Sequence, residues 1–406
     1  MTLTRGTPVL AKGQAELIYK SCNPDRYYLF DSFGDQGQFA EWQGSQLQPL
    51  ELTAEVLRTN FSRFYSFGRY FSVRSGSDPE IFAELNGEPL AAWKFLSSEA
   101  EAKPVYSPII HYHPPEAKAY WDGAQAELST SGKVDCHILL VDDIQCGLKA
   151  IYSAMKAKFP GAELVCKDVV KLSKQDLASG PEDAIRFGCN PSFNVYGIPA
   201  VQIEDARAMP LRFSGTHIHQ SARMAEIQNT PPAWWPDGVV VMLDKIVGVT
   251  LTALGRGLEN PERRKFYGRP GEYRLPQREE RLSLEYRTPG SFLMRSPTLM
   301  NFAFDLTRKA FQFAMIADGR LLDIPDVVSL IMNCDADAAL KLMAGHSAIF
   351  NQFLRPADLR AIKLGASGLG FSSVESEWGL SSAKPWRAYN NNLTCGWSSV
   401  LEARGI

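Results

Sequence analysis

Hydrophobic and polar positions alternate along several short stretches of this chain, and turn residues or single helical segments separate these stretches. Residues 17–19, 27–30, 70–74 and 81–85 predict strands, and Asn86-Gly87 predicts a tight turn to a partner strand at 89–95. A second strand-rich block covers residues 185–219. Apolar residues spaced by three and four positions predict helices over 52–64, 141–159, 238–258, 299–317 and 338–353.

Strand blocks separated by single helices predict an α+β fold in which helices pack on an antiparallel β-sheet. The pattern divides the chain into an N-terminal accessory segment (1–65), a core (66–320) and a C-terminal helical segment (321–406) whose tail is loop-like from residue 372. No internal repeat or low-complexity linker interrupts the sequence.

Composition limits the kinds of protein this chain can be. The 406 residues are 45% hydrophobic and 22% charged, which predicts a folded globular protein. The formal net charge of −2 predicts no overall attraction to nucleic acid or to an anionic membrane. The apolar runs are too short to span a bilayer, and the start of the chain does not resemble a signal peptide. Seven cysteines without CxxC spacing favour reduced thiols in a cytoplasmic protein.

Two short stretches place carboxylates on strand faces. Asp78 and Glu80 lie two residues apart at the start of a predicted strand, so both side chains point to the same side. Paired carboxylates are hard oxygen ligands suited to Mg²⁺ or Mn²⁺. The alternative is a solvated turn, because Asp78-Pro79 is also a common turn sequence. Glu127 shares the polar face of a second strand, which follows a turn at Asp122-Gly123; taken alone, this face could simply be exposed to solvent.

Histidine pairs supply a third candidate. His217 and His219 lie two apart on one strand face, where imidazoles can bind a metal or a nucleotide. Two hydrogen-bonded structural histidines are the alternative. His111 and His113 have the same spacing, but flanking prolines favour a loop without a site there.

The fourth candidate is the stretch from Arg256 to Arg287. It contains nine Lys or Arg and six Glu, a local balance of +3, with glycines that allow close approach of the backbone to a ligand. Arginine forks match phosphate oxygens. Glu285 and Arg287 share a strand face, which suits a metal–phosphate site. Nucleic-acid binding is the rival interpretation, but it predicts a more uniformly basic surface.

The order of these motifs resembles the glutamine-synthetase and glutamate–cysteine ligase superfamily, and more closely the phage-type COOH–NH2 ligases, the type 2 amidoligases of phiEco32-like phages. The resemblance covers about residues 70–320. The matching segments are Ser77-Asp78-Pro79-Glu80, 122–127, Phe187-Gly188-Cys189-Asn190-Pro191, Gly215-Thr216-His217-Ile218-His219, 267–274 and Leu284-Glu285-Tyr286-Arg287-Thr288.

This resemblance implies a curved antiparallel sheet, the glutamine-synthetase-like half-barrel, and an ATP-dependent ligase that joins a small-molecule or peptide carboxylate to an amine through an acyl phosphate. It also implies the cofactors ATP and Mg²⁺ or Mn²⁺, and the cytoplasm, of a host cell if a phage encodes the chain. The implied metal ligands are Asp78, Glu80, Glu127, His217 and Glu285. The implied catalytic residues are Arg287, Arg274 and Glu127. The implied nucleotide or phosphate contacts are His219, Arg256, Arg269, Arg274 and Arg287.

The chain departs from the family pattern at two places. Asn190 and Ser192 stand where the family has acids, and Gly215-Thr216 replaces a more usual Gly-Gly. These departures leave open a non-catalytic descendant that serves as a binding or virion-associated component. A homo-oligomeric assembly is left open as well.

Overall fold

The computed structural model describes residues 8–11, 14–23, 26–29, 40–69, 71–105, 117–130, 137–185, 192–199, 201, 203, 205–223, 231–277, 280–382, 397 and 401–402. Three stretches lie outside the described residues: the predicted loop around His111 and His113, the matching segment at 187–191 and most of the tail after residue 382.

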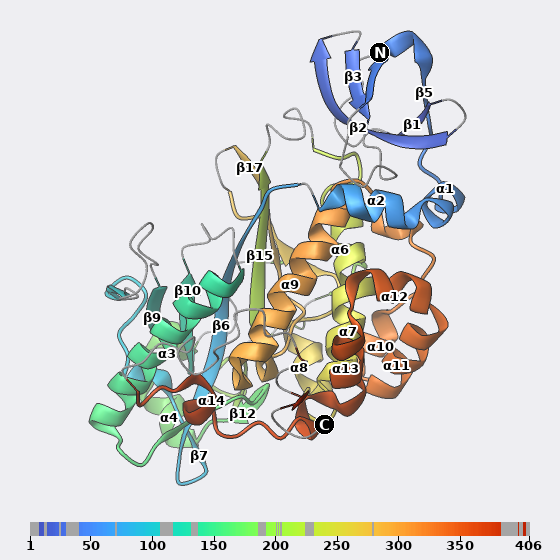
Figure 1. Ribbon diagram of the computed structural model, residues 1–406. Coiled ribbons are helices and arrows are strands. Elements are labelled where there is room, and N and C mark those ends of the chain that lie inside the picture. The colour runs from blue at the N-terminus through green and yellow to red at the C-terminus, as the bar shows by residue number, and fades with distance from the viewer. Residues whose placement is uncertain are drawn as a thin grey trace.

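A large antiparallel sheet forms the centre of the molecule (Figure 1). Its strands follow the order β13 (Phe193–Asn194), β16 (Glu272–Arg274), β17 (Arg281–Tyr286), β15 (Thr216–Arg223), β6 (Val73–Leu85), β10 (Gln125–Thr130), β9 (Ala117–Asp122) and β8 (Pro104–Val105). Strands β7 (Glu88–Leu90) and β11 (Glu163–Val165) also pair with β6. The sheet is open, and the predicted α+β class with helices packed on an antiparallel sheet is confirmed.

The central strand β6 is longer than the sequence pattern predicts. The two strands expected at 70–74 and 81–85 are one strand, Val73–Leu85, so Asp78-Pro79 lies inside a strand and the turn interpretation is wrong. Proline has no N–H to donate, and β10 pairs directly with β6 only at Glu80 and Ile81. Thr130 Oγ1 instead bonds to the backbone of Ser77, donating to its oxygen at 3.1 Å and accepting from its nitrogen at 2.8 Å.

Side chains alternate between the two faces of this sheet. Ile81, Ile218 and Leu284 are fully buried in the main hydrophobic core. Helices α3 (His137–Lys158) and α9 (Pro297–Ala314), both predicted from spacing, pack against these strands (Figure 1). Because the side-chain period of a strand is two, the residues between these apolar positions point to the opposite face. That face carries Asp78 and Glu80.

The predicted helix at 238–258 forms one continuous helical stretch with a π-helical turn in its middle. It consists of α6 (Asp237–Leu243), the π-helical segment η4 (Asp244–Gly248) and α7 (Val249–Leu254), and its residues are buried from Gly238 to Leu254. The predicted helix at 52–64 is split at Asn60 into α1 (Ala54–Thr59) and α2 (Phe61–Gly68). The predicted helix at 338–353 is split at His346 into α11 (Ala336–Gly345) and α12 (Ser347–Phe353).

The remaining elements are short connections or C-terminal helices. Helices α13 (Pro356–Gly368) and α14 (Val374–Trp378) were not predicted, and α14 lies in the stretch expected to be a loop. The others are η1 (Gly44–Gln46), η2 (Ala92–Lys94), β12 (Val169–Lys171), α4 (Lys174–Ser179), α5 (Glu182–Ile185), β14 (Leu211–Phe213), α8 (Pro261–Phe266), η5 (Ser291–Arg295), η6 (Gly319–Leu321) and α10 (Val328–Met332).

The N-terminal strands make a separate antiparallel sheet. Its order is β4 (Ala40–Gln43), β3 (Arg26–Leu29), β2 (Gln14–Asn23), β1 (Pro8–Ala11) and β5 (Leu47–Pro49), which confirms the strands predicted at 17–19 and 27–30 within the described residues. Val9, Ala11, Ile18 and Leu47 form its own small core.

The main core continues across both predicted segment boundaries. Phe61 of α2 packs on Phe313 of α9 with ring centroids 4.8 Å apart, and Tyr65 packs on Phe353 of α12 at the same distance. The division of the chain at residues 65 and 320 therefore stays a prediction. None of the described helices has the length and continuous apolar character needed to cross a bilayer.

Phe313 gives a direct test of this shared core. It is 1% exposed and contacts aromatic rings from α2 and α12, so Phe313→Ala should lower the free energy of unfolding by about 3–5 kcal/mol. Phe193→Ala is the control, because that phenylalanine is 58% exposed and should cost about 1 kcal/mol or less. Urea denaturation measures both, and equal losses would contradict the packing.

Candidate active site

Strand register brings the predicted polar residues together on one face of the sheet. His217 lies opposite Asp78 in the β15–β6 pair, and Glu127 lies opposite Glu80 in the β10–β6 pair. His219 and Arg274 both lie opposite Glu285, from the strands on either side of β17. Directly opposed residues of antiparallel strands point to the same face. The sheet therefore gathers side chains that are as much as 207 residues apart, from Asp78 to Glu285, into one site.

One group of potential ligands is Asp78, His217 and Glu285. One atom from each lies within 4.8 Å of the others. His217 Nδ1 is 3.4 Å from Asp78 Oδ1 and 3.6 Å from Glu285 Oε1. His217 and Glu285 are almost fully buried, whereas Asp78 is partly exposed. We call this the histidine group.

A second group consists of Glu80, Asp122 and Glu127, whose ligand atoms also lie within 4.8 Å of one another. We call this the carboxylate group. Asp122 was not among the predicted ligands, because Asp122-Gly123 also looks like an ordinary turn. The signal was present nevertheless: Asp122 ends β9 directly before the hairpin, and the β9–β10 register pairs it with Gln125, two positions before Glu127.

The carboxylate group carries a strong electrostatic cost. Burial, with the negative charges of Asp78 and Asp122, raises the pKa of Glu127 well above its usual range. Burial also raises the pKa of Glu80. Like charges at this spacing oppose one another, and a divalent cation relieves the repulsion. Oxygen donors from carboxylates with one imidazole nitrogen fit Mg²⁺ or Mn²⁺, so the residues present suit the implied metals.

Arg287 lies beside the histidine group. Its side chain is 2% exposed, and Nη1 forms an ion pair with Glu285 Oε1 and lies 3.4 Å from His217 Nδ1. Arg274, from β16, approaches the same Glu285 oxygen with its Nη1 at 3.6 Å. The structure thus brings Arg274 and Arg287, two of the four arginines that the resemblance implies for nucleotide or phosphate, to the edge of the histidine group.

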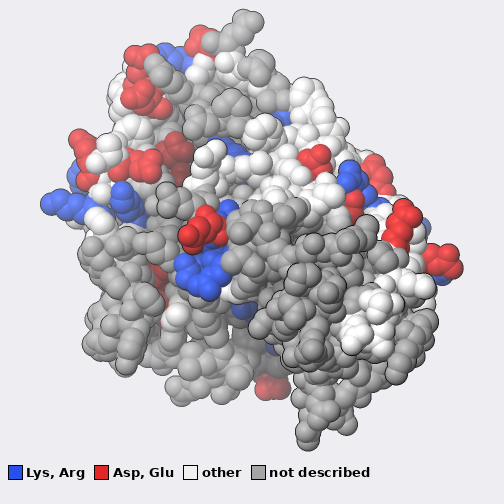
Figure 2. Space-filling view, turned by 90° about the horizontal axis from the view of Figure 1, so that it is seen from above, with Lys and Arg blue, Asp and Glu red and all other residues white. Residues whose placement is uncertain are grey.

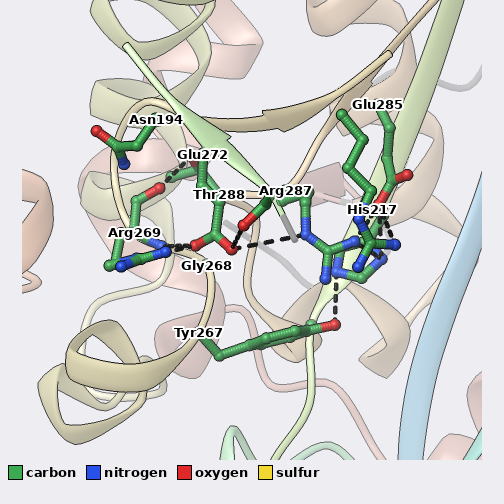
Figure 3. A network of polar contacts seen from close by, with 12 residues as sticks. Asn194, His217, Tyr267, Gly268, Arg269, Glu272, Glu285, Arg287 and Thr288 are labelled. Atoms are coloured by element: carbon green, nitrogen blue, oxygen red, sulfur yellow. Dashed lines mark hydrogen bonds and ion pairs between the residues drawn. The ribbon is translucent and has the colours of Figure 1, made fainter. Parts of the chain in front are cut away.

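Arg269, in the loop between α8 and β16, and Glu272, at the start of β16, form a polar network that reaches Arg287 (Figure 3). Glu272 lies between Arg269 and Arg287: its Oε2 accepts hydrogen bonds from the backbone N and the Nε of Arg269, and its Oε1 is 3.7 Å from Arg287 Nε. Burial disfavours its charge, but Arg287 and Arg269 outweigh burial and lower the pKa of Glu272. Arg269 is therefore a buried partner of Glu272, 3% exposed, and Glu272 links it to Arg287.

Ser192 belongs to this network as well. Its hydroxyl donates to Glu272 Oε1 at 2.6 Å. Ser192, one of the two neutral residues that stand where the resemblance has acids, thus lies against the carboxylate of Glu272 in β16. Glu272 was missed as a site residue, although it lies in one of the matching segments, because its type and spacing gave no sign of its pairing with Arg287. Asn190 lies outside the described residues.

The π-helical turn anchors the same loop. Asp244 Oδ2 accepts from Gly271 N at 2.5 Å, and its Oδ1 accepts from the hydroxyls of Tyr286 at 2.7 Å and Thr288 at 3.3 Å. One buried carboxylate thereby fixes the loop before Arg274 and both neighbours of Arg287 in sequence. Nothing in the sequence singled out Asp244, which lies in an apolar run.

The structure places His219 beside the site and Arg256 away from it. His219 Nε2 is 2.9 Å from Asp78 Oδ1, so it lies beside the histidine group, and its contact with nucleotide stays a prediction. Arg256 is not brought to the site: its Nη2 pairs with Asp337 of α11, and Ser367 of α13 donates to its backbone oxygen. Residue 256 follows α7, and the C-terminal helices packed on α7 supply its partners.

Gly215 is required at its position by close packing. Its N–H donates to Glu80 Oε2 at 2.7 Å, and a Cβ there would lie 2.4 Å from Arg263 Nη2. Gly215, which stands where the resemblance has the first glycine of a Gly-Gly pair, thus holds the side chain of Glu80, one of the implied metal ligands. Thr216, the changed residue, is buried without a hydrogen bond to its hydroxyl.

No protein-family model matches the chain, and no curated protein matches it. Solved structures that align with it include apo GmaS without ligand, at 13% identity over 96% of this chain and 90% of that chain, with a TM-score of 0.37. A novel glutamine synthase homolog aligns at 12% identity over 90% of this chain and 85% of that chain, with a TM-score of 0.34. At these values neither neighbour identifies the function of this chain.

Asp244 allows a test of the buried anchor. Burial raises its pKa from 3.8 to about 6, so the native carboxyl keeps its proton to a higher pH than the unfolded one. This group should therefore make the free energy of unfolding fall by about 2 kcal/mol as the pH rises from about 4 to about 6. In Asp244→Asn that part of the pH dependence should disappear.

Urea denaturation across this pH range measures the effect. Asp323→Asn is the matched control, because Asp323 is exposed and should leave the wild-type pH dependence unchanged. If Asp244→Asn and wild type lose stability in parallel, Asp244 is not a buried carboxyl with a raised pKa.

Proposed function

We propose that this protein is an ATP-dependent carboxylate–amine ligase that forms an amide through an acyl phosphate. The observation that carries the proposal is the pair of ligand groups on one sheet face, with Arg287 and Arg274 at their edge. Two groups of hard ligands beside two guanidinium forks suit a polyphosphate with its cations better than they suit a neutral substrate.

Bound divalent cations would neutralise the polyphosphate and the charge that develops during phosphoryl transfer. The histidine group and the carboxylate group would hold one cation each. Arg287 and Arg274 would contact the transferred phosphoryl group, where charge-assisted hydrogen bonds stabilise the transition state. The carboxylate oxygen of the substrate would attack the γ-phosphorus and release ADP. The amine would then attack the acyl carbon and release phosphate.

The acids Glu272 and Glu285 keep Arg287 oriented for this role. A guanidinium held between two carboxylates has little rotamer freedom left to lose when it binds phosphate. Ser192 completes the Glu272 side of that arrangement. The carboxylate substrate is a small molecule or a peptide. The amine substrate is of unspecified structure.

A second candidate function is a non-catalytic binding or virion-associated protein on the same fold. The observation that favours it is the enclosure of Arg287, which is 2% exposed and already paired, so that it must exchange a partner to reach phosphate. Calorimetry with ATP and Mg²⁺ separates the two candidates, because the ligase requires binding. The net charge of −2 does not favour a nucleic-acid partner. On the face seen in Figure 2, the acidic and basic side chains of the described residues are interspersed.

Glu285 tests the histidine group. Glu285→Ala removes the carboxylate that contacts His217, Arg274 and Arg287, so Mn²⁺ affinity should fall at least about 10-fold, and ADP release that requires Mg²⁺, a carboxylate and an amine together should be lost. Glu88→Ala is the control, because Glu88 is exposed at the β6–β7 hairpin and should leave both measurements unchanged. Full activity in Glu285→Ala would refute the site.

Arg287 and Arg256 form a second, matched pair of tests. Arg287→Lys keeps a positive charge but loses the planar fork, and it should lower the rate of ADP release by about 10²-fold. Arg256→Lys should have no effect, because Arg256 pairs with Asp337 on the surface. ADP release is followed with saturating ATP and Mg²⁺. Equal effects of the two substitutions would contradict the placement of these arginines.

A further inference from the structure

Tyr267 lies between the two ligand groups. Its hydroxyl oxygen is 2.7 Å from Glu80 Oε1, in the carboxylate group. The same oxygen is 2.6 Å from His217 Nε2, in the histidine group (Figure 3). Both distances are those of strong hydrogen bonds. Tyr267 opens the matching segment at 267–274, but the sequence predicted no role for it, because it lies just after α8 and far along the chain from both of these partners.

Donor and acceptor capacity fixes the direction of the hydrogen bonds around His217. The Tyr267 hydroxyl has one proton, and it donates that proton to Glu80 Oε1 at 2.7 Å. Its oxygen can then only accept at the 2.6 Å contact with His217, so Nε2 carries the proton and donates to it. In a neutral imidazole whose Nε2 carries the proton, Nδ1 is an acceptor. An accepting Nδ1 also suits the guanidinium of Arg287, whose Nη1 lies 3.4 Å away.

We propose that Tyr267 is a positioning residue that joins the two ligand groups and holds His217 in the tautomer whose Nδ1 can bind a cation. This inference rests on the proposed function, since it concerns how the ligands of that site are held. Nδ1 faces Asp78 and Glu285, so the tautomer that Tyr267 favours leaves three acceptors converging in the histidine group. The same hydroxyl holds Glu80 in place within the carboxylate group.

The surrounding structure holds the Tyr267 ring firmly. The guanidinium carbons of Arg263 and Arg287 each lie 5.2 Å from the centre of the ring. Arg263 is fully buried and donates to the backbone oxygens of Thr288 and Pro289, so it cannot easily move away. Gly268 follows with a φ of 63°, and a Cβ there would overlap the Arg263 guanidinium. The loop can therefore present the hydroxyl at a fixed place.

Tyr267→Phe tests the inference, because it keeps the ring and removes only the hydroxyl. Mn²⁺ affinity, measured by electron paramagnetic resonance of the free ion, should fall about 10- to 100-fold. Nitrogen-15 spectra of the histidine rings with Mg²⁺ should show Nε2–H for His217 in the wild type and a loss of that preference in Tyr267→Phe. His217→Gln identifies the His217 signals. A thermal melt confirms that the variant is folded.

Tyr152→Phe is the matched control, because it removes a tyrosine hydroxyl that donates to Glu375 at 2.6 Å, a contact that includes none of the site residues. It should change neither the affinity nor the spectrum. Wild-type Mn²⁺ affinity and an unchanged His217 tautomer in folded Tyr267→Phe would overturn the role of Tyr267 while leaving the proposed function intact. A wild type that binds no Mn²⁺ would overturn the proposed function, and this inference with it.

Discussion

Several carboxylates are buried close together on one face of an antiparallel sheet, and the rest of this structure depends on how that charge is compensated. Taking an ionised carboxylate out of water costs several kcal/mol, even after the protein has relaxed around it. The fold meets this cost with arginines that are themselves buried, Arg287 and Arg269, and with hydrogen bonds from backbone N–H groups such as that of Gly215. The carboxylate group, where Glu127 has a strongly raised pKa, is the part that the protein compensates least.

The compensating residues form one connected network. Glu272 links Arg269 to Arg287, Glu285 links Arg287 to Arg274, and Asp244 holds the loop and strand that carry them. Buried ion pairs contribute little net stability when they are compared with well-packed apolar side chains. Their value here is geometric, since a guanidinium fixed by two carboxylates keeps one orientation. The same network explains why polar residues appear in otherwise apolar elements, as Asp244 does in the helical stretch at 237–254.

The two faces of the large antiparallel sheet have different roles. One face packs against α3 and α9 and makes the main core, to which residues from α2 and from the C-terminal helices also belong. The other face carries the ligand groups and is bordered by the loop that contains Tyr267. Because the side-chain period of a strand is two, any shift of register by one residue would exchange these faces. The hydrophobic core therefore fixes the positions of the site residues.

The sequence by itself determined the alternation that puts Asp78 with Glu80, His217 with His219 and Glu285 with Arg287 on common strand faces. It also determined the long helices α3 and α9, because local periodicity is enough to specify them. Only the tertiary structure decided which strands are neighbours, and so which of these pairs meet. It added Asp122, Glu272, Asp244 and Tyr267, whose roles depend on partners distant in sequence. It also placed Arg256 on the surface, because the composition of a basic stretch does not record the direction in which each side chain points.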